Sequence, residues 1–366
     1  MSNRFLEFCV PGVSSLKPYI PGKPISELER ELGISNTVKL ASNENPLGPP
    51  KAAKAVIHGE LDELALYPDG SGFALTQALA QKHNFDPAGI TLGNGSNDVL
   101  DMIARVFLNE GTEAIFSQYA FAVYPIVTQA VGAAAQIAPA KDFGHDLDAM
   151  FGLISERTRV IFIANPNNPT GTWLNESELK SFVDKVPKNI IVVIDEAYTE
   201  YVTESDYPDC SLWLSEYDNL IVTRTFSKAY GLAGLRVGYC LSDPGVANLL
   251  NRVRQPFNVN SLAQAAALAA LDDETHLQQS IALNASGLKQ YETAFKEMEL
   301  DWIASVGNFI TVNVARDVAE VDKALLQLGV ITRPVANYGM IDYLRISVGL
   351  PEENQRCIEA LQSVLK

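Results

Sequence analysis

Three nearly continuous apolar stretches in the middle of the chain predict buried β-strands. They are rich in β-branched residues and comprise Arg159–Ala164, Asn189–Ile194 and Asn219–Arg224. Such runs are typical of strands covered on both faces, as in a parallel sheet. Stretches with helical spacing lie before and between them, including Ser96–Leu108, for which we expect Ser96 as the N-cap, and Asn175–Val186. This alternation predicts an α/β fold with right-handed crossovers.

The two ends of the chain have a different character. The first 50 residues are rich in Pro and Gly and predict an extended arm with a short helix near Ser26–Leu32. This arm either wraps its own domain or packs on a partner subunit. Beyond about residue 260, long helical stretches are followed by short strands at Asn308–Val314 and Tyr343–Val348. We therefore expect an arm (1–45), a large domain (46–275) and a smaller α+β domain (276–366).

Composition narrows the function classes. Among 366 residues, 44 are acidic and 28 basic, which gives a formal net charge of −16. A field of this sign argues against binding to nucleic acids or anionic membranes. No apolar run reaches the length of a membrane helix, and we expect no signal peptide at the N-terminus. The four cysteines form no C-x-x-C pair and the four histidines no metal-ligand spacing, so we expect a cytoplasmic protein without a metal.

Polar residues follow each of the three predicted central strands. An amide-rich turn, Asn165–Gly171, follows the first strand, Asp195 the second and Lys228 the third. Because ligands bind beyond the carboxyl ends of strands in open α/β sheets, these groups are candidates for one site. The loop Gly93–Asn97 precedes a helix and resembles an anion-binding turn. Each feature alone has an ordinary structural explanation, such as a turn, a cap or a solvated lysine. Their joint order along the chain favours a site.

Pyridoxal 5′-phosphate requires this combination of groups. It needs a lysine for a Schiff base, a carboxylate for its ring nitrogen and a site for its phosphate. Lys228, Asp195 and the Gly93–Asn97 loop supply the three. Lys228 would also serve as the general base, which requires that burial and neighbouring positive charge lower its pKa.

Several segments carry a resemblance to a known family. They are Leu16–Tyr19, Leu40–Pro46, Tyr67–Gly70, Asn165–Gly171, Asp195–Tyr198, Ser227–Gly238 and Leu344–Ser347. Over nearly its whole length the chain resembles the fold-type I pyridoxal-phosphate-dependent aminotransferases of class I/II. The early Lys-Pro-Tyr and the Tyr-Pro-Asp are more specific for the branch that acts on histidinol phosphate.

The resemblance implies a role for each matching position. The residues that would bind the cofactor are Gly95, Ser96, Asn97, Tyr119, Asn168, Asp195, Tyr198, Ser227, Lys228, Arg236 and, from the partner subunit of a homodimer, Tyr67. Asp195 would pair with the ring nitrogen, Asn168 and Tyr198 would contact the phenolic oxygen, and Tyr119 would stack on the ring. The substrate-binding residues would be Tyr19, Asn43, Arg333 and Arg345, with Tyr19 serving either its own site or the partner's. The segment Phe116–Phe121 departs from the Pro-Thr-Tyr of many relatives.

The activity implied by the resemblance is a transamination in L-histidine biosynthesis. It would interconvert histidinol phosphate and 2-oxoglutarate with imidazole-acetol phosphate and glutamate. Three alternatives remain: an aminotransferase for aromatic or aspartate-type substrates, a decarboxylase of the threonine-phosphate type, and the ligand-sensing part of a transcription regulator. The acidic charge and the early start of the resemblance, near Leu16, weigh against the last.

Overall fold

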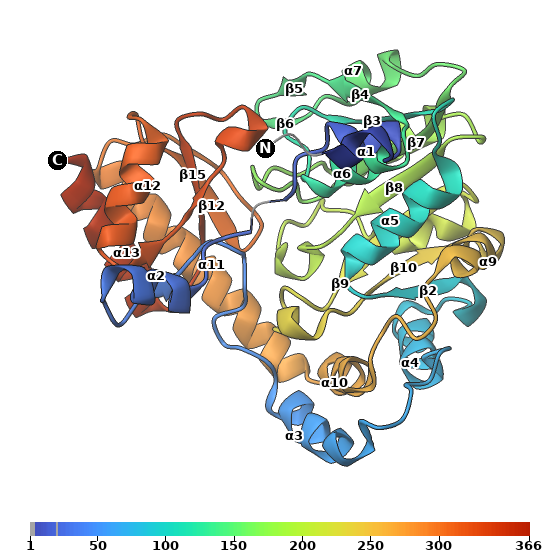
Figure 1. Cartoon of the computed structure of the whole chain (residues 1–366), viewed down its shortest axis with the longest axis horizontal. Coiled ribbons are helices and arrows are strands. Elements are labelled where there is room, and N and C mark those ends of the chain that lie inside the picture. Colours follow the sequence, from blue (N-terminus) through green and yellow to red (C-terminus); the bar gives the residue numbers. More distant parts are fainter. Residues whose placement is uncertain (1–3, 20) are drawn as a thin grey trace.

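A seven-stranded sheet forms the centre of the larger part of the molecule. The computed structural model describes residues 4–19 and 21–366 (Figure 1). The strand order is β2-β10-β9-β8-β7-β3-β4. The bounds are β2 (Ile90–Gly93), β3 (Glu113–Ser117), β4 (Ala134–Ala138), β7 (Thr158–Ala164), β8 (Ile191–Asp195), β9 (Leu220–Thr225) and β10 (Gly238–Ser242). Strands β4, β3, β7, β8 and β9 run parallel, whereas β10 pairs antiparallel with both β9 and β2.

Alternating side chains of the central strands enter two separate cores. Along β7, Val160 and Phe162 contribute to one core cluster, and Ile161 and Ile163 to the other. The first cluster is completed by α5 (Ser96–Phe107), α6 (Val123–Ala130) and α9 (Pro244–Val253), and the second by α4 (Phe73–His83), α7 (Leu147–Gly152), α8 (Glu176–Lys185) and α10 (Ser261–Leu271). Both faces of the sheet are therefore covered, as the apolar runs predicted.

A smaller α+β unit follows in the chain. Its four-stranded sheet has the order β11 (Trp302–Ile303), β12 (Phe309–Asn313), β15 (Tyr343–Ser347), β14 (Arg333–Pro334). Helices α12 (Val318–Gln327) and α13 (Pro351–Leu365) pack on it. The long helix α11 (Glu274–Glu297) joins the two parts, since Leu277 belongs to the large core and Tyr291 to the small one (Figure 1). We propose that the boundary between residues 275 and 276 falls at the start of this helix, whose first turns still pack on the large core.

The N-terminal arm lies against both parts. Helix α1 (Pro11–Ser14) approaches α6, where the Gln129 amide donates to Ser15 Oγ at 2.9 Å. Helix α2 (Ile25–Leu32) lies beside the small unit (Figure 1), and β1 (Val38–Lys39) pairs in parallel with β13 (Val330–Ile331). Helix α3 (Lys51–Glu60) then begins the large part by packing on α10. The remaining elements are the hairpin β5 (Ala140–Lys141) and β6 (Gly144–His145) and the 3₁₀ helices η1 (Arg4–Glu7), η2 (Leu61–Glu63), η3 (Pro87–Gly89), η4 (Thr199–Tyr201), η5 (Cys210–Ser215), η6 (Ala233–Leu235) and η7 (Ala336–Tyr338).

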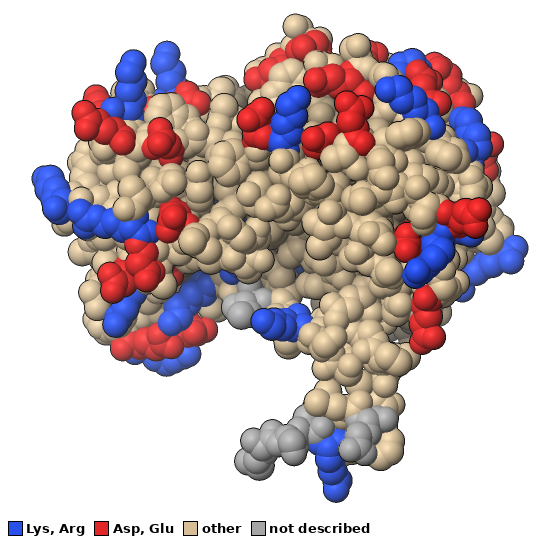
Figure 2. Space-filling model, turned by 90° about the horizontal axis from the view of Figure 1, so that it is seen from above, with Lys and Arg blue, Asp and Glu red and all other residues tan. Residues whose placement is uncertain are grey.

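Charged side chains are spread over the outer surface. Figure 2 shows Asp and Glu interspersed with Lys and Arg around the rim of one face. Within residues 4–19 and 21–366, no helix combines the length and apolarity needed to span a bilayer.

Candidate active site

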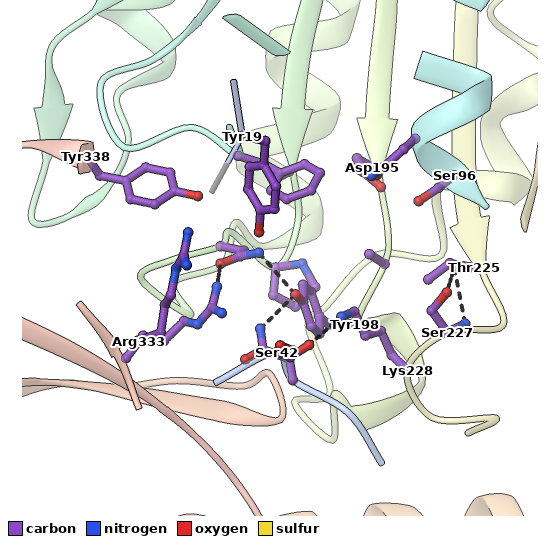
Figure 3. A pocket seen from close by; sticks show the side chains of 18 of the residues that line it. Tyr19, Ser42, Ser96, Asp195, Tyr198, Thr225, Ser227, Lys228, Arg333 and Tyr338 are labelled. Carbon is purple, nitrogen blue, oxygen red and sulfur yellow. Dashed lines mark hydrogen bonds between the residues drawn. The ribbon is translucent and has the colours of Figure 1, made fainter. Parts of the chain in front are cut away.

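A cavity of about 190 Å³ opens at the carboxyl ends of β7, β8 and β9, where the arm and the small unit meet the large sheet. Most residues singled out from the sequence line it: Tyr19, Asn43, Ser96, Asn97, Asn168, Asp195, Tyr198, Ser227, Lys228, Arg236, Arg333 and Arg345. In Figure 3, Ser96 and Asp195 stand at one end and Arg333 and Tyr338 at the other, with Tyr198 between them. The fold therefore brings residues from the arm, the large domain and the small unit to one place.

Lys228 follows β9 and its amine is enclosed by the cavity wall. Nζ donates to the Ser42 carbonyl at 3.2 Å and lies 5.6 Å from the centre of the Tyr198 ring. Burial, followed by the positive charge of Arg345 and, more weakly, Arg236, lowers the pKa of Lys228 to about 7. A large share of this amine is therefore uncharged near neutral pH, as a nucleophile or general base must be.

Asp195 is the last residue of β8 and is only 4% exposed. Its Oδ1 accepts a hydrogen bond from the Thr223 hydroxyl at 2.8 Å, and its Oδ2 accepts one from the Tyr124 hydroxyl at 2.9 Å. Burial raises the pKa of Asp195, whereas the two hydroxyl donors and the positive charge of Lys228 oppose this rise. A carboxylate in such surroundings favours a cationic partner in the cavity.

Near Asp195, a second group of residues forms an anion cradle, which we define as Gly95, Ser96, Asn97, Ser227 and Arg236. Ser96 and Asn97 begin helix α5, whose N-terminal amides and dipole attract anions. Arg236 Nη1 donates to Ser227 Oγ at 3.2 Å. Gly95 has a φ of +84°, which strains any other residue, and a Cβ on it would lie 2.2 Å from Arg236 Nη2 and so displace that guanidinium. The helix start and the guanidinium together suit a phosphate.

A polar chain connects Arg345 to Tyr198. Arg345 Nη1 donates to Asn168 Oδ1 at 2.5 Å, and Nη2 donates to the Ala41 carbonyl at 2.7 Å. The Asn168 amide then donates to the Tyr198 hydroxyl oxygen at 3.1 Å, and the Asn43 amide donates to the same oxygen at 2.9 Å. Because that oxygen accepts two hydrogen bonds, the Tyr198 proton is left for a different acceptor.

The arginines define the other end of the cavity. Arg345 is buried, and its Nε has no acceptor among the described residues. Arg333 lies with its guanidinium 5.6 Å from the centre of the Tyr19 ring, and Tyr338 stands beside it in Figure 3. Two guanidinium groups in one partly enclosed pocket favour an anionic ligand group, either carboxylate or phosphate.

Three of the predicted cofactor contacts, Gly95, Tyr119 and Tyr67, are not part of the cavity lining in this chain, although Gly95 directly precedes the lining residue Ser96. The Tyr119 ring packs against Phe143, with centroids 5.8 Å apart, and it is Phe121 from the same loop that lines the cavity. The unusual Phe116–Phe121 segment thus presents a different aromatic residue. Tyr67 is 82% exposed and stacks on Phe257 with centroids 4.6 Å apart. Its side chain is available to a neighbouring molecule.

Sequence reasoning missed several residues that shape the site. Phe121, Thr225 and Tyr338 line the cavity, while Tyr124 and Thr223 contact Asp195. Thr223 and Thr225 stand two residues apart in β9 and so point to the same face of the sheet, which is a signal for polar contacts on that face. Tyr124 gives no such signal, because its partner lies 71 residues further along the chain.

Comparisons with known proteins agree in family and in fold. The family described as "Aminotransferase class I and II" matches residues 35–361. The "Histidinol-phosphate aminotransferase 2" of Pseudomonas fluorescens is 58% identical over 100% of this chain and 99% of its own. The protein of the same name from Pseudomonas aeruginosa is 57% identical over 99% and 98%. The crystal structure of histidinol-phosphate aminotransferase from Sinorhizobium meliloti in complex with pyridoxal-5′-phosphate is similar with a TM-score of 0.88 and 27% identity, covering 97% of this chain and 96% of that one.

Proposed function

The chain belongs to the class I and II aminotransferases, and from this premise we propose that it is a histidinol-phosphate aminotransferase. It exchanges an amino group between histidinol phosphate and 2-oxoglutarate, giving imidazole-acetol phosphate and glutamate, in L-histidine biosynthesis. Full-length relatives of this name at 57–58% identity support the reaction. The observation that carries the proposal is the position of Lys228 and Asp195 between an anion cradle and a pair of arginines in one cavity (Figure 3).

The cavity fits pyridoxal 5′-phosphate. In the anion cradle the Arg236 guanidinium lies against Gly95, which carries no side chain, beside the N-terminal amides of α5 that would face a phosphate. Asp195 would hold the ring nitrogen, and the Tyr198 proton and the Asn168 amide would meet the phenolic oxygen. When bound, the cofactor draws electrons away from the substrate Cα and so makes its proton removable.

Lys228 and Arg345 have separate roles in the proposed reaction. Lys228 would hold the cofactor through Nζ, and the same amine would accept and return the proton at the substrate Cα. Its pKa of about 7 suits both tasks, since the amine must accept and return a proton at working pH. Arg345 is hydrogen-bonded to Asn168 and thereby fixes the amide that faces the cofactor.

One substrate pocket has to accept two different anions. Glutamate presents a carboxylate and histidinol phosphate a phosphate, and a guanidinium matches either group with paired hydrogen bonds. Arg345 and Arg333, with Tyr19 from the arm and Asn43, would bind this group. Anchoring the remote end of the substrate orients Cα toward Lys228, which converts binding energy into rate. We assign the ring-stacking position to Phe121, which lines the cavity where Tyr119 does not.

The active unit is a homodimer in this proposal. Leu64, Leu66, Tyr67 and Phe73 are exposed apolar side chains close together in the chain, and a patch of this kind favours a protein partner. Tyr67 from this patch would reach the anion cradle of the second subunit. The double variant Leu64→Glu with Leu66→Glu should give monomers by light scattering and bind the cofactor more weakly. Leu328→Glu, at an exposed leucine of the small unit, is the control, and monomeric wild-type protein would refute the dimer.

We assign the activity to the cytoplasm. This rests on the cysteines, which are all unpaired within the described residues, and on the biosynthetic reaction. Fractionation of cells that express the chain would test it.

A substrate panel tests the reaction. Purified chain loaded with the cofactor is assayed with 2-oxoglutarate and histidinol phosphate, phenylalanine or aspartate as amino donor. We expect the highest kcat/KM with histidinol phosphate. A higher value with phenylalanine or aspartate would assign the chain to another aminotransferase specificity, and release of CO₂ from threonine phosphate without formation of glutamate would assign it to the decarboxylases.

A further inference from the structure

A tyrosine outside the cavity reaches the carboxylate at its deep end. Tyr124 lies on α6, and its hydroxyl is 2.9 Å from Asp195 Oδ2. We propose that Tyr124 is a positioning residue that holds and orients the Asp195 carboxylate toward the ring nitrogen of the cofactor. The inference rests on the proposed function, because it requires that Asp195 binds that nitrogen.

The contacts of the carboxylate divide evenly between its oxygens. Tyr124 from α6 donates to Oδ2, and Thr223 from β9 donates to Oδ1 at 2.8 Å. Two donors from different elements fix the plane of the carboxyl group. Since each carboxylate oxygen can accept more than one hydrogen bond, both oxygens keep acceptor capacity for a group in the cavity that Asp195 lines.

The ring of Tyr124 is itself held rigidly. It is fully buried and lies parallel to Phe162 of β7, with centroids 4.9 Å apart and an interplanar angle of 8°. Phe121 packs edge-on against the Tyr124 ring, with centroids 5.9 Å apart and an interplanar angle of 87°. Aromatic contacts of this geometry restrict the ring, so the hydroxyl has one position from which to donate. Because Phe121 lines the cavity, the same ring also supports a second wall of the site.

The charge balance around Asp195 explains why a donor is useful there. The titratable groups that act on it or sense it are Tyr124, Lys228 and Tyr198. Burial raises the pKa of Asp195, and the hydrogen bonds from Thr223 and Tyr124 counteract this. Burial also raises the pKa of Tyr124 well above its ordinary value, so the phenol remains a donor at every working pH.

A protonated Asp195 would bind the cofactor less well. An ionised Asp195 and a protonated ring nitrogen form a hydrogen bond through a single proton. A protonated Asp195 and a protonated ring nitrogen bring two protons to the same contact, which has room for one. The surplus proton must leave on binding, which weakens affinity below the pKa of the acid. Loss of the Tyr124 donor therefore moves the acid limit of cofactor binding to higher pH.

The test is Tyr124→Phe in the full chain, which removes the hydroxyl and keeps the stacked ring. The control is Tyr291→Phe, at an equally buried tyrosine that stacks on Phe295 in the core of the small unit. The dissociation constant of pyridoxal 5′-phosphate is measured by absorption between pH 5 and 8, and the melting temperature of the cofactor-free chain is measured alongside it. The same measurements are made on Asp195→Asn alone and on the double variant Asp195→Asn with Tyr124→Phe.

We expect Tyr124→Phe to raise the dissociation constant about tenfold at pH 7 and to shift its acid midpoint upward by about one unit, the size of one charge-assisted hydrogen bond. Tyr291→Phe should leave both unchanged. In the Asp195→Asn background the effect of Tyr124→Phe should shrink to about threefold or less. A Tyr124→Phe chain that melts lower but keeps the wild-type affinity and midpoint would show a packing role only and overturn the inference. Wild-type chain that binds no cofactor would overturn the proposed function and this inference with it.

Discussion

Replacing Arg345 with lysine keeps a positive charge in the substrate pocket but removes the planar fork. In the structure the guanidinium donates to Asn168 Oδ1 at 2.5 Å and to the Ala41 carbonyl at 2.7 Å, and its Nε has no acceptor among the described residues. It also lies 5.5 Å from the centre of the Phe309 ring. An ammonium group reaches fewer of these partners and meets an anion at a single point.

The expected loss follows from the hydrogen bonds. When paired contact with a carboxylate or phosphate becomes single contact, one charge-assisted hydrogen bond disappears, at about 1.5–3 kcal/mol. At about 1.4 kcal/mol per factor of ten, kcat/KM should fall by about 10- to 100-fold for 2-oxoglutarate and histidinol phosphate alike. The Asn168 amide also loses its anchor, so part of the loss should appear in kcat rather than in KM.

Steady-state kinetics with each substrate varied in turn measures the effect. Arg316→Lys makes the same substitution at an exposed arginine that bonds carbonyls at the chain end, and it should be silent. A second variant, Arg345→Gln, tests the effect of the Arg345 charge on the pKa of Lys228. Since the charge of Arg345 is the second largest cause of the low pKa of Lys228, its removal should raise that pKa, whereas Arg345→Lys should not. An Arg345→Lys enzyme within about threefold of wild type would refute this role.

Two further predictions concern Lys228 and Gly95, at the part of the cavity that would bind the cofactor. Because burial and two arginines lower the pKa of Lys228 to about 7, the neutral amine that captures the cofactor is lost as the pH falls through this value. The rate of cofactor capture by cofactor-free chain, followed by absorption, should fall about tenfold per unit below pH 7, and an equal rate at pH 5 and 7 would contradict the assignment. Gly95→Ala places a Cβ 2.2 Å from Arg236 Nη2 at a φ of +84° and should weaken cofactor binding at least about tenfold. Gly339→Ala has a similar φ of +82° in open space, so equal affinities of the two variants would refute the steric argument.

The main elements could be predicted because their signals are local. The three central strands were predicted within about two residues of β7, β8 and β9, and the strands at Asn308–Val314 and Tyr343–Val348 within about one residue of β12 and β15. The N-cap of α5 was predicted wrongly: Gly95 occupies that position and Ser96 is the first helical residue. Only a glycine tolerates the φ and the contact with Arg236 there, and this steric demand overrides the preference for a serine cap. The antiparallel β10 was missed because a five-residue strand that begins with glycine carries little pattern.

The site was predictable as far as it follows strand ends. Asp195 ends β8, and Asn168 and Lys228 follow the neighbouring parallel strands β7 and β9, so topology alone brings these positions together. Tyr124 and Phe121 could not be found in this way. The sequence around both residues has the pattern of an ordinary buried helix and its preceding loop. Their roles depend on contacts between segments that are far apart in the chain.

The most direct test of the central claim is a single half-reaction. Histidinol phosphate is added, without any keto acid, to purified chain loaded with pyridoxal 5′-phosphate. The account predicts loss of the visible absorption of the lysine-bound cofactor, one equivalent of imidazole-acetol phosphate per site, and recovery of the absorption when 2-oxoglutarate is added. Lys228→Ala should show neither the starting absorption nor the product. Unchanged absorption in the wild-type chain, or full turnover by Lys228→Ala, would contradict the account.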